Sequence, residues 1–242
     1  MGADNHEGQG VFLTAEWKNL AMLNYAVDPS LLARFVPSGT ELDSFEGVTY
    51  LSLIGFEFNR TRIFGIPVPF HQTFEEVNLR FYVRRGDKRG VVFVRELVPK
   101  FAVAAIARLA FNENYTSVQM SHWIESHGGD RVEAEFAWGP RKSRSTMRIE
   151  TEGASFLPAE GSVSQFITEH YWGYASQPDG SCLEYEVQHP RWMVRSARQA
   201  GFSGNAAALF GNEIAECLNR NPDSAFLADG SAVTVFKGRK IS

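Results

Sequence analysis

The chain has 242 residues, of which 44% are hydrophobic and 13% are aromatic, so it can bury a sizeable core and extensive disorder is excluded. Its formal net charge of −4 argues against nucleic acid as the main partner, because proteins that bind nucleic acid usually carry a basic face. The two cysteines, Cys182 and Cys217, lie far apart and form no disulfide framework, which fits a reducing compartment and a cytoplasmic location.

The N-terminal residues form no recognisable targeting signal, because they are polar and rich in glycine. We expect residues 1–10 to be a disordered tail and residues 11–242 to form a single domain, since no repeat or linker interrupts the pattern. The most continuous apolar stretch, Phe101–Phe111, contains Arg108 and is too short to span a bilayer. We therefore expect no membrane partner.

The first elements in chain order are two long strands separated by a short helix. Val11–Val27 is predicted to be a strand, and Val48–Phe58 is predicted to be another. Between them, Asp28 can cap a helix that has Pro29 at its first position.

Thr73–Arg84 alternates with a period of two, which is typical of a half-buried strand. Its apolar face and its polar face consist of Val77, Leu79, Phe81 and Val83, and of Glu76, Asn78, Arg80 and Tyr82. A turn follows at Arg85–Lys88, and Gly90–Val98 is predicted to be the returning strand.

The remainder alternates between short strands and two helices. The predicted helices are Pro99–Phe111 and Ala206–Leu218. The predicted strands are Tyr115–Glu125, Arg131–Trp138, Ser145–Glu152, Ser164–Ala175, Ser181–Gln188 and Ala225–Lys237. Short strands at regular spacing, separated by turn residues, favour a mainly β barrel or sandwich.

Several stretches resemble the YqjF-like family of domains of unknown function (family 2071). They are Pro37–Asp43, Phe74–Arg80, Thr168–Tyr171, Glu184–Val187, His189–Trp192 and Ala228–Gly230. The resemblance runs over most of the chain. It implies an antiparallel acetoacetate decarboxylase-like β-barrel with a few flanking helices, but it implies no reaction, because members of the family are mostly unassigned.

A more distant resemblance to acetoacetate decarboxylase itself suggests catalytic residues. The stretch Arg95–Lys100 is similar to the motif whose first lysine forms a Schiff base with a β-keto acid, and this role falls on Lys100. The decarboxylase's strand glutamate corresponds to Glu76, and its N-terminal arginine corresponds to Lys18. The second motif lysine is replaced by Phe101, so Lys18 would have to supply most of the positive field.

Lys100 admits two interpretations. As a nucleophile, it must be neutral, and burial or the N-terminus of the predicted helix would lower its pKa. As an ordinary surface lysine, it would extend its ammonium into solvent.

The polar face of Thr73–Arg84 also admits two interpretations. If it lines the barrel, Glu76 and Asn78 point into a cavity in which Arg80 can bind a carboxylate bidentately. If it meets water, the same residues are ordinary surface. Because adjacent strand residues point to opposite sides, we expect Glu76 inside and Glu75 outside.

Other cofactor and metal patterns are missing from the sequence. His122 and His127 are five residues apart and do not form a His-Glu-x-x-His zinc motif, so we expect no metal. Glycine-rich nucleotide loops and the Gly-x-Ser-x-Gly nucleophile turn are also missing, so we expect no cofactor.

Three functions remain open. The first is an enzyme that acts on a small carbonyl or keto-acid compound through Lys100. The second is a non-catalytic binder of a small apolar or acidic ligand. The third is a structural or interaction protein whose barrel is filled by its own side chains. No pattern in the sequence specifies an oligomeric state.

Overall fold

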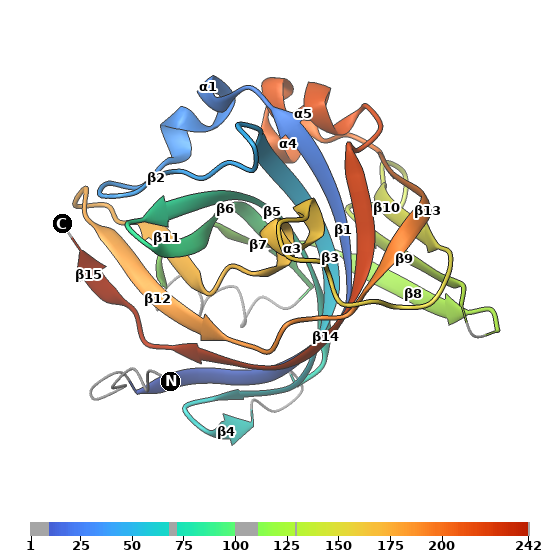
Figure 1. Cartoon of the computed structure of the whole chain (residues 1–242), viewed down its shortest axis with the longest axis horizontal. Coiled ribbons are helices and arrows are strands. Elements are labelled where there is room, and N and C mark those ends of the chain that lie inside the picture. Colours follow the sequence, from blue (N-terminus) through green and yellow to red (C-terminus); the bar gives the residue numbers. More distant parts are fainter. Residues whose placement is uncertain (1–9, 68–71, 100–110, 129, 242) are drawn as a thin grey trace.

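The computed structural model describes residues 10–67, 72–99, 111–128 and 130–241. Figure 1 shows a ring of strands with helices above it and a second group of strands beside it. The larger strands are β1 (Val11–Val27), β3 (Thr49–Ile63), β5 (Phe74–Arg85), β6 (Lys88–Val98), β8 (Met120–Ser126), β9 (Val132–Trp138), β10 (Ser145–Thr151), β11 (Trp172–Ser176), β12 (Cys182–Gln188), β13 (Val194–Ser203) and β14 (Ser224–Phe236). The short strands are β2 (Glu41–Leu42), β4 (Ile66–Pro67), β7 (Tyr115–Ser117) and β15 (Arg239–Ile241).

The strands of the ring pair in the order β12, β11, β6, β5, β3, β1, β14. The ring closes because β14 pairs with β12, through Val235 with Val187 and Thr234 with Gln188. The predicted mainly β class is confirmed. The pairing in the ring is mainly antiparallel, as predicted, with two exceptions: β6 runs parallel to both β11 and β7.

A second layer, formed by β8, β9, β10 and β13, covers one outer side of the ring (Figure 1). β13 joins the two parts, because Val194–Ser196 pairs with β14 and the following residues pair with β10. The layer approaches β3 closely at Gly55, where an added Cβ would lie 2.7 Å from the Phe136 ring. The side chains buried between the layer and the ring include Phe136, Met147, Ile149, Leu53, Val77 and Leu79.

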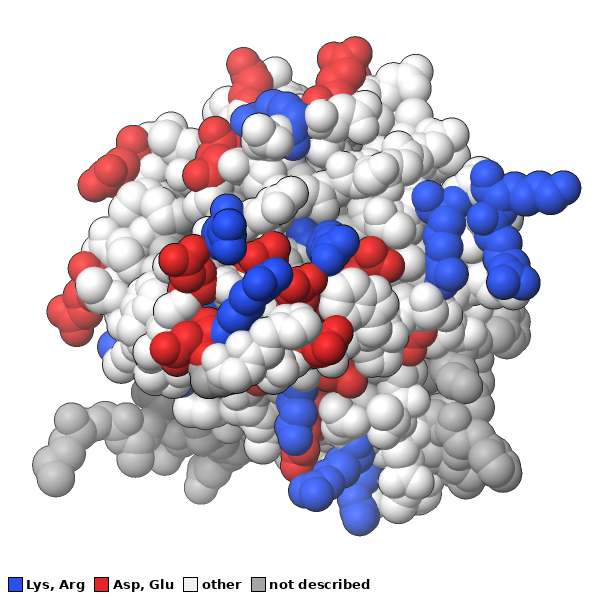
Figure 2. Space-filling model, turned by 90° about the vertical axis from the view of Figure 1, so that its right-hand side faces the viewer, with Lys and Arg blue, Asp and Glu red and all other residues white. Residues whose placement is uncertain are grey.

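The outward face of the second layer carries charges of both signs. Figure 2 views this side and shows acidic and basic side chains interleaved. Glu133 accepts hydrogen bonds from Arg131 at 2.6 Å and from Arg148 at 2.7 Å. Arg131 and Arg148 are therefore matched by a neighbouring carboxylate.

The described helices are α1 (Pro29–Leu32), the 3₁₀ turn Ala33–Phe35, α3 (Val163–Thr168), α4 (Ala207–Phe210) and α5 (Asn212–Leu218). Asp28 caps α1 as predicted, since its side chain accepts a hydrogen bond from the Ser30 amide. Most of the predicted helix Pro99–Phe111 lies outside the described residues. None of the helices in the described part of the chain is long and apolar enough to cross a membrane.

Three predictions of secondary structure are wrong. The single strand predicted over Tyr115–Glu125 is two strands, because β7 pairs with β6 in the ring and β8 pairs with β9 in the second layer. The single helix predicted over Ala206–Leu218 is interrupted at Gly211, whose φ of 86° lies outside the helical region. The strand predicted over Ser164–Ala175 begins only at Trp172, because Ser162 caps a helix by accepting a hydrogen bond from the Gln165 amide.

β5 is buried on both faces, but one face meets an apolar core and the other meets a cavity. This difference explains why apolar and polar residues alternate along the strand. The odd-numbered residues from Val77 to Val83 pack into an apolar core outside the ring. The second layer and the helices cover this core. The even-numbered residues Glu76, Asn78 and Arg80 point into the ring, where they line a cavity. The polar face predicted for this strand is therefore enclosed by the ring instead of meeting water.

A break in β1 controls which of its side chains enter the ring. Trp17 and Leu20 both line the cavity although they are three residues apart, because β1 shifts register against β3 between Lys18 and Ala21. Asn19 lies within this shift and has a φ of 54°. On the partner strand, Gly230 has a φ of 80°, and an added Cβ would lie 2.1 Å from the Trp17 carbonyl oxygen. Glycine at 230 thus permits the break that places Trp17 inside.

We predict that Gly230→Ala lowers the free energy of unfolding by at least about 2 kcal/mol, because it adds both backbone strain and a steric clash. Urea denaturation monitored by circular dichroism measures the change. Gly201→Ala is the matched control, since an added Cβ there meets nothing within 4 Å. Equal stability of the two variants would contradict the role assigned to Gly230.

Candidate functional site

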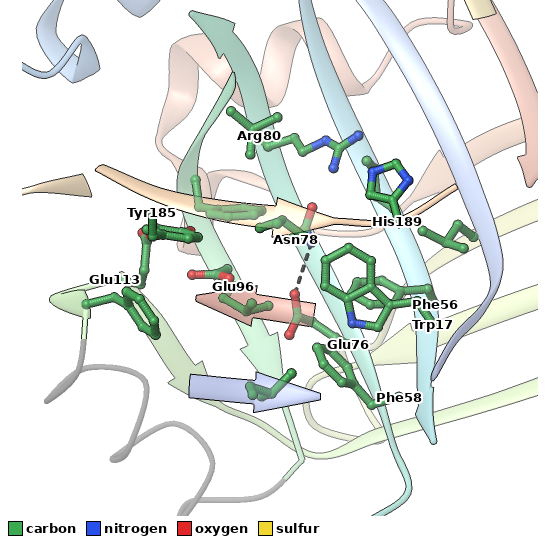
Figure 3. A pocket seen from close by; sticks show the side chains of 18 of the residues that line it. Trp17, Phe56, Phe58, Glu76, Asn78, Arg80, Glu96, Glu113, Tyr185 and His189 are labelled. Atoms are coloured by element: carbon green, nitrogen blue, oxygen red, sulfur yellow. Dashed lines mark hydrogen bonds between the residues drawn. The ribbon is translucent and has the colours of Figure 1, made fainter. Parts of the chain in front are cut away.

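The interior of the ring holds a cavity of about 120 Å³ (Figure 3). Its walls are largely aromatic, and Trp17 packs edge-on against Phe56, Phe58 and Trp192 with ring centroids 5.4, 5.7 and 6.2 Å away. The polar lining residues are Thr61, Glu76, Asn78, Arg80, Glu96, Glu113, Tyr115, Thr168, His170, Tyr185 and His189. An apolar wall with a few polar groups is typical of a small-molecule site.

One group of carboxyls lies on neighbouring elements of the ring. We call Glu76, Glu96 and Glu113 the acid cluster. β5 carries Glu76, β6 carries Glu96 opposite Asn78, and Glu113 precedes β7. All of them are buried and line the cavity.

The hydrogen bonds that the acid cluster accepts from described residues come from neutral groups. Glu76 accepts from Asn78 Nδ2 at 3.0 Å and from the Tyr115 hydroxyl at 3.3 Å. Glu113 accepts from the Tyr185 hydroxyl at 2.9 Å. Glu96 Oε2 has no hydrogen-bond partner although the residue is only 2% exposed.

Burial and mutual repulsion make the acid cluster hold protons near neutral pH. Burial raises the pKa of Glu76 to about 7 and the pKa of Glu113 to about 8. Burial also raises the pKa of Glu96 well above its ordinary value, and the neighbouring Glu113 and Glu76 raise it further. Each group is thereby able to exchange a proton at neutral pH or above it.

The other end of the cavity is basic. Arg80 is buried, donates from Nη2 to the Ile167 carbonyl at 3.1 Å, and leaves Nε without a hydrogen-bond partner. Figure 3 shows the guanidinium beside His189, on the opposite side of the view from Glu113 and Tyr185. Burial and the charge of Arg80 lower the pKa of His189, so the histidine is neutral at pH 7. The positive charge at this end therefore belongs to Arg80.

His170 extends the basic end toward the outside of the ring. Burial lowers its pKa to about 4, so its ring is neutral at pH 7. Its Nε2 lies 3.7 Å from Asp43 Oδ2, and the same carboxylate accepts a hydrogen bond from Arg89 Nε at 2.7 Å. The charge of Asp43 is thus balanced by Arg89. Asp43 therefore does not serve as the partner of Arg80.

The structure brings three of the predicted site residues together. Glu76, Asn78 and Arg80 line the same cavity. Glu75 lies on the outer side, with Oε2 3.7 Å from His122 Nδ1, so the predicted orientation of Glu76 and Glu75 is confirmed. The catalytic and ligand-binding roles of these residues stay predictions.

Lys18 does not lie in the cavity. The Lys18 side chain is 52% exposed, and its Nζ lies 3.3 Å from Glu16 Oε2. In an unbroken strand Lys18 would share a face with Leu20, which lines the cavity, but the break at Asn19 turns Lys18 outward. Lys100 lies outside the described residues.

The sequence interpretation did not identify Glu113, Tyr185, His170 or His189 as site residues. Three of these fall in or beside the family-like stretches Thr168–Tyr171, Glu184–Val187 and His189–Trp192, which was the available signal. Glu113 carried no signal, because it lies alone between two asparagines after a predicted helix. Arg95 and Glu96 are adjacent on β6, so strand alternation allows only one of them to face the ligand, and Glu96 is the one that lines the cavity.

The comparisons with known proteins concern both sequence and fold. The model of the DUF2071 family, described as an uncharacterized conserved protein, matches residues 14–232. The uncharacterized protein YqjF of Bacillus subtilis is 25% identical over 183 residues, which cover 75% of this chain and 74% of YqjF.

Two solved structures share the fold over the whole chain. An acetoacetate decarboxylase-like enzyme from Sphingomonas wittichii aligns with a TM-score of 0.69 at 11% identity, covering 100% of this chain and 99% of the enzyme. The enduracididine biosynthesis enzyme MppR, complexed with the condensation product of pyruvate and imidazole 4-carboxaldehyde, aligns with a TM-score of 0.67 at 12% identity, covering 100% and 93%. At these identities the likeness shows a common fold.

We predict that the acid cluster makes stability fall as the pH rises. Groups whose pKa is raised by folding contribute stability below their unfolded pKa near 4.5, and this is lost as the pH passes about 7 for Glu76 and about 8 for Glu113. Glu113→Gln keeps an acceptor for Tyr185 and removes one titration, so its stability should fall less steeply between pH 5 and 9. The difference in slope has an upper limit of about 1.4 kcal/mol per pH unit.

Urea denaturation at intervals of pH measures both slopes. Glu160→Gln, at an exposed position, is the control and should follow the unsubstituted chain. Parallel curves for Glu113→Gln and the unsubstituted chain would show that Glu113 does not take up a proton on folding.

Proposed function

We propose that the chain, which belongs to the DUF2071 family of uncharacterized conserved proteins, binds a small organic acid in the cavity of the ring. The observation that carries this proposal is Arg80. Arg80 is 8% exposed, lines an aromatic-walled cavity and has an Nε without a hydrogen-bond partner. A buried guanidinium that is incompletely satisfied costs stability, and a ligand carboxylate would supply the missing acceptors bidentately.

The size of the cavity limits the ligand. Its volume of about 120 Å³ is somewhat smaller than a cavity of about 150 Å³ that accommodates benzene. The ligand therefore has on the order of six non-hydrogen atoms, with a short apolar body that packs against Trp17, Phe56 and Phe58. The same space argues against a ring that is filled by its own side chains.

The fold neighbours support an acid that contains a carbonyl group. One is named an acetoacetate decarboxylase-like enzyme, and the other holds a product of pyruvate condensation. Pyruvate is a carboxylate of the size that the cavity admits, so it is the first ligand to test.

A second candidate function is catalysis on a keto acid through a Schiff base at Lys100. Two observations favour it. The stretch Arg95–Lys100 resembles the decarboxylase motif, and Glu76 lies in the cavity with a pKa of about 7, which suits a group that takes and returns a proton. Lys18, which faces outward, is not positioned to lower the pKa of an amine in the cavity.

We predict that Arg80→Met weakens the binding of pyruvate and pentanoate by about tenfold to a hundredfold, because a charged hydrogen bond of roughly 1.5–3 kcal/mol is lost. Methionine keeps most of the side-chain volume and packs against the aromatic wall. Isothermal titration calorimetry at pH 7 measures the dissociation constants.

Arg62→Met, on the exposed part of β3, is the control and should bind as the unsubstituted chain does. A circular dichroism melt of each variant confirms that it is folded. Undiminished binding by folded Arg80→Met would refute the proposed carboxylate site.

The catalytic candidate makes a separate prediction. Incubation with pyruvate or acetoacetate followed by sodium borohydride should add the mass of the reduced adduct to the peptide that contains Lys100, because borohydride reduces a Schiff base to a stable amine. Mass spectrometry of the digested protein locates the adduct, and Lys100→Met should abolish it. Binding of these acids without any adduct would leave the chain as a binding protein.

A further inference from the structure

Outside the cavity, the described buried carboxylates Glu184 and Asp43 are matched by cations. Glu184 is fully buried, yet it lies 2.9 Å from Lys88 Nζ and 2.6 Å from Arg239 Nη2. Burial raises the pKa of Glu184, but hydrogen bonds from Arg239 and Lys88 outweigh it and lower the pKa below its ordinary value. Asp43 is paired in the same way with Arg89 at 2.7 Å.

The acid cluster departs from this pattern. Among the described residues, its hydrogen bonds come from an amide and from two phenols, which carry no charge. Glu96 Oε2 points into the cavity region without any hydrogen-bond partner, although the residue is 2% exposed. Glu96 Oε2 is therefore an acceptor that still lacks a donor. Because a carboxylate accepts several hydrogen bonds, the cluster can receive further donors and a positive charge.

We propose that the ligand carries, at the end opposite its carboxylate, a protonated amine that Glu96 binds together with Glu76 and Glu113. The carboxylate end at Arg80 rests on the proposed function. Together the two ends define the ligand as a small zwitterion, an amino acid whose amine and carboxylate are separated by a short apolar chain.

The chemistry of the donors favours an amine over a carbonyl at this end. An ammonium has three donors and no acceptor, so it can serve several carboxylates at once. A ketone oxygen can only accept hydrogen bonds, so it can be bound by a protonated carboxyl group of the cluster, but it supplies no donor to the carboxyl oxygens that remain. Figure 3 places Arg80 and His189 on one side of the cavity and Glu113 on the other, with Glu76 and Glu96 between them.

An organic cation also fits better than a metal ion. In the described part of the chain, no three acidic, histidine or cysteine side chains are arranged to hold a metal. An ammonium contacts carboxylate oxygens at about 2.7–2.9 Å, which is longer than a typical metal–oxygen bond, and it accepts a wider range of geometries than a metal ion does.

Binding of an amine has a proton signature. In the empty cavity the acid cluster holds protons at neutral pH, because burial and mutual repulsion disfavour its ionised form. An arriving ammonium favours the ionised form, so protons pass from the carboxyl groups to the buffer as the ligand binds.

The test compares amino acids with isosteres in which a methyl group replaces the ammonium. The intact chain is titrated at pH 7 with 3-aminopropanoate, 4-aminobutanoate and 5-aminopentanoate, and with butanoate, pentanoate and hexanoate. We expect the best amino acid to bind at least about tenfold more tightly than its isostere. Its heat of binding should change with the ionisation enthalpy of the buffer, in the direction of proton release.

Glu96→Gln keeps the size of the side chain and removes its charge. In this variant the preference for the amino acid should disappear, while the isostere binds within about twofold of its affinity for the unsubstituted chain. Glu160→Gln is the control and should keep the preference. A preference that survives in folded Glu96→Gln contradicts the assignment of Glu96.

The outcomes separate this inference from the proposed function. If the isosteres or pyruvate bind and the amino acids bind no more tightly, the amine site is refuted while the organic-acid site stands. If neither series binds, and pyruvate does not bind, both proposals fail.

Discussion

Closure of the strand ring between β12 and β14 is the constraint on which the site depends. In an open sheet, a strand face that carries a carboxyl, an amide and a guanidinium would be directed to water. Closure encloses that face of β5, so Glu76 and Arg80 lie among aromatic rings and keep few of their contacts with solvent. Their charges consequently act in a medium where Coulomb interactions are stronger than in water.

The second layer buries the apolar outer face of β5, which would otherwise be exposed to solvent when the ring closes. It covers the outer side of the ring and gives the odd-numbered residues of the strand an apolar environment. The close approach at Gly55 lets Phe136 pack directly on the ring. The polar interior is thereby supported by a conventional core outside it, and the cost of burying Arg80 and the acid cluster is offset by packing elsewhere.

The two ends of the cavity differ from the buried charges outside it, because both ends are incompletely hydrogen-bonded. The protein neutralises Glu184 and Asp43 with its own cations, whereas Arg80 and Glu96 each keep a buried polar atom without a partner. Such atoms lower stability, because a buried polar group that makes no hydrogen bond loses its solvation without compensation. Proteins that keep a cost of this kind generally use it for binding or catalysis.

The sequence by itself determined the mainly β class, the whole of β1, and the alternation along β5 that sets Glu76, Asn78 and Arg80 on one face. Local patterns suffice for these features, because a strand's period and its turn residues act over a few positions. Only the tertiary structure decided whether that face meets water or a cavity, since either environment gives the same alternation. The tertiary structure also turned Lys18 outward, because the break at Asn19 requires Gly230 on a strand more than 200 residues away. Glu113 lies near Glu76 and Glu96 because β6 pairs with both β5 and β7. This proximity also depends on tertiary structure, since the spacing of the three glutamates along the chain does not predict it.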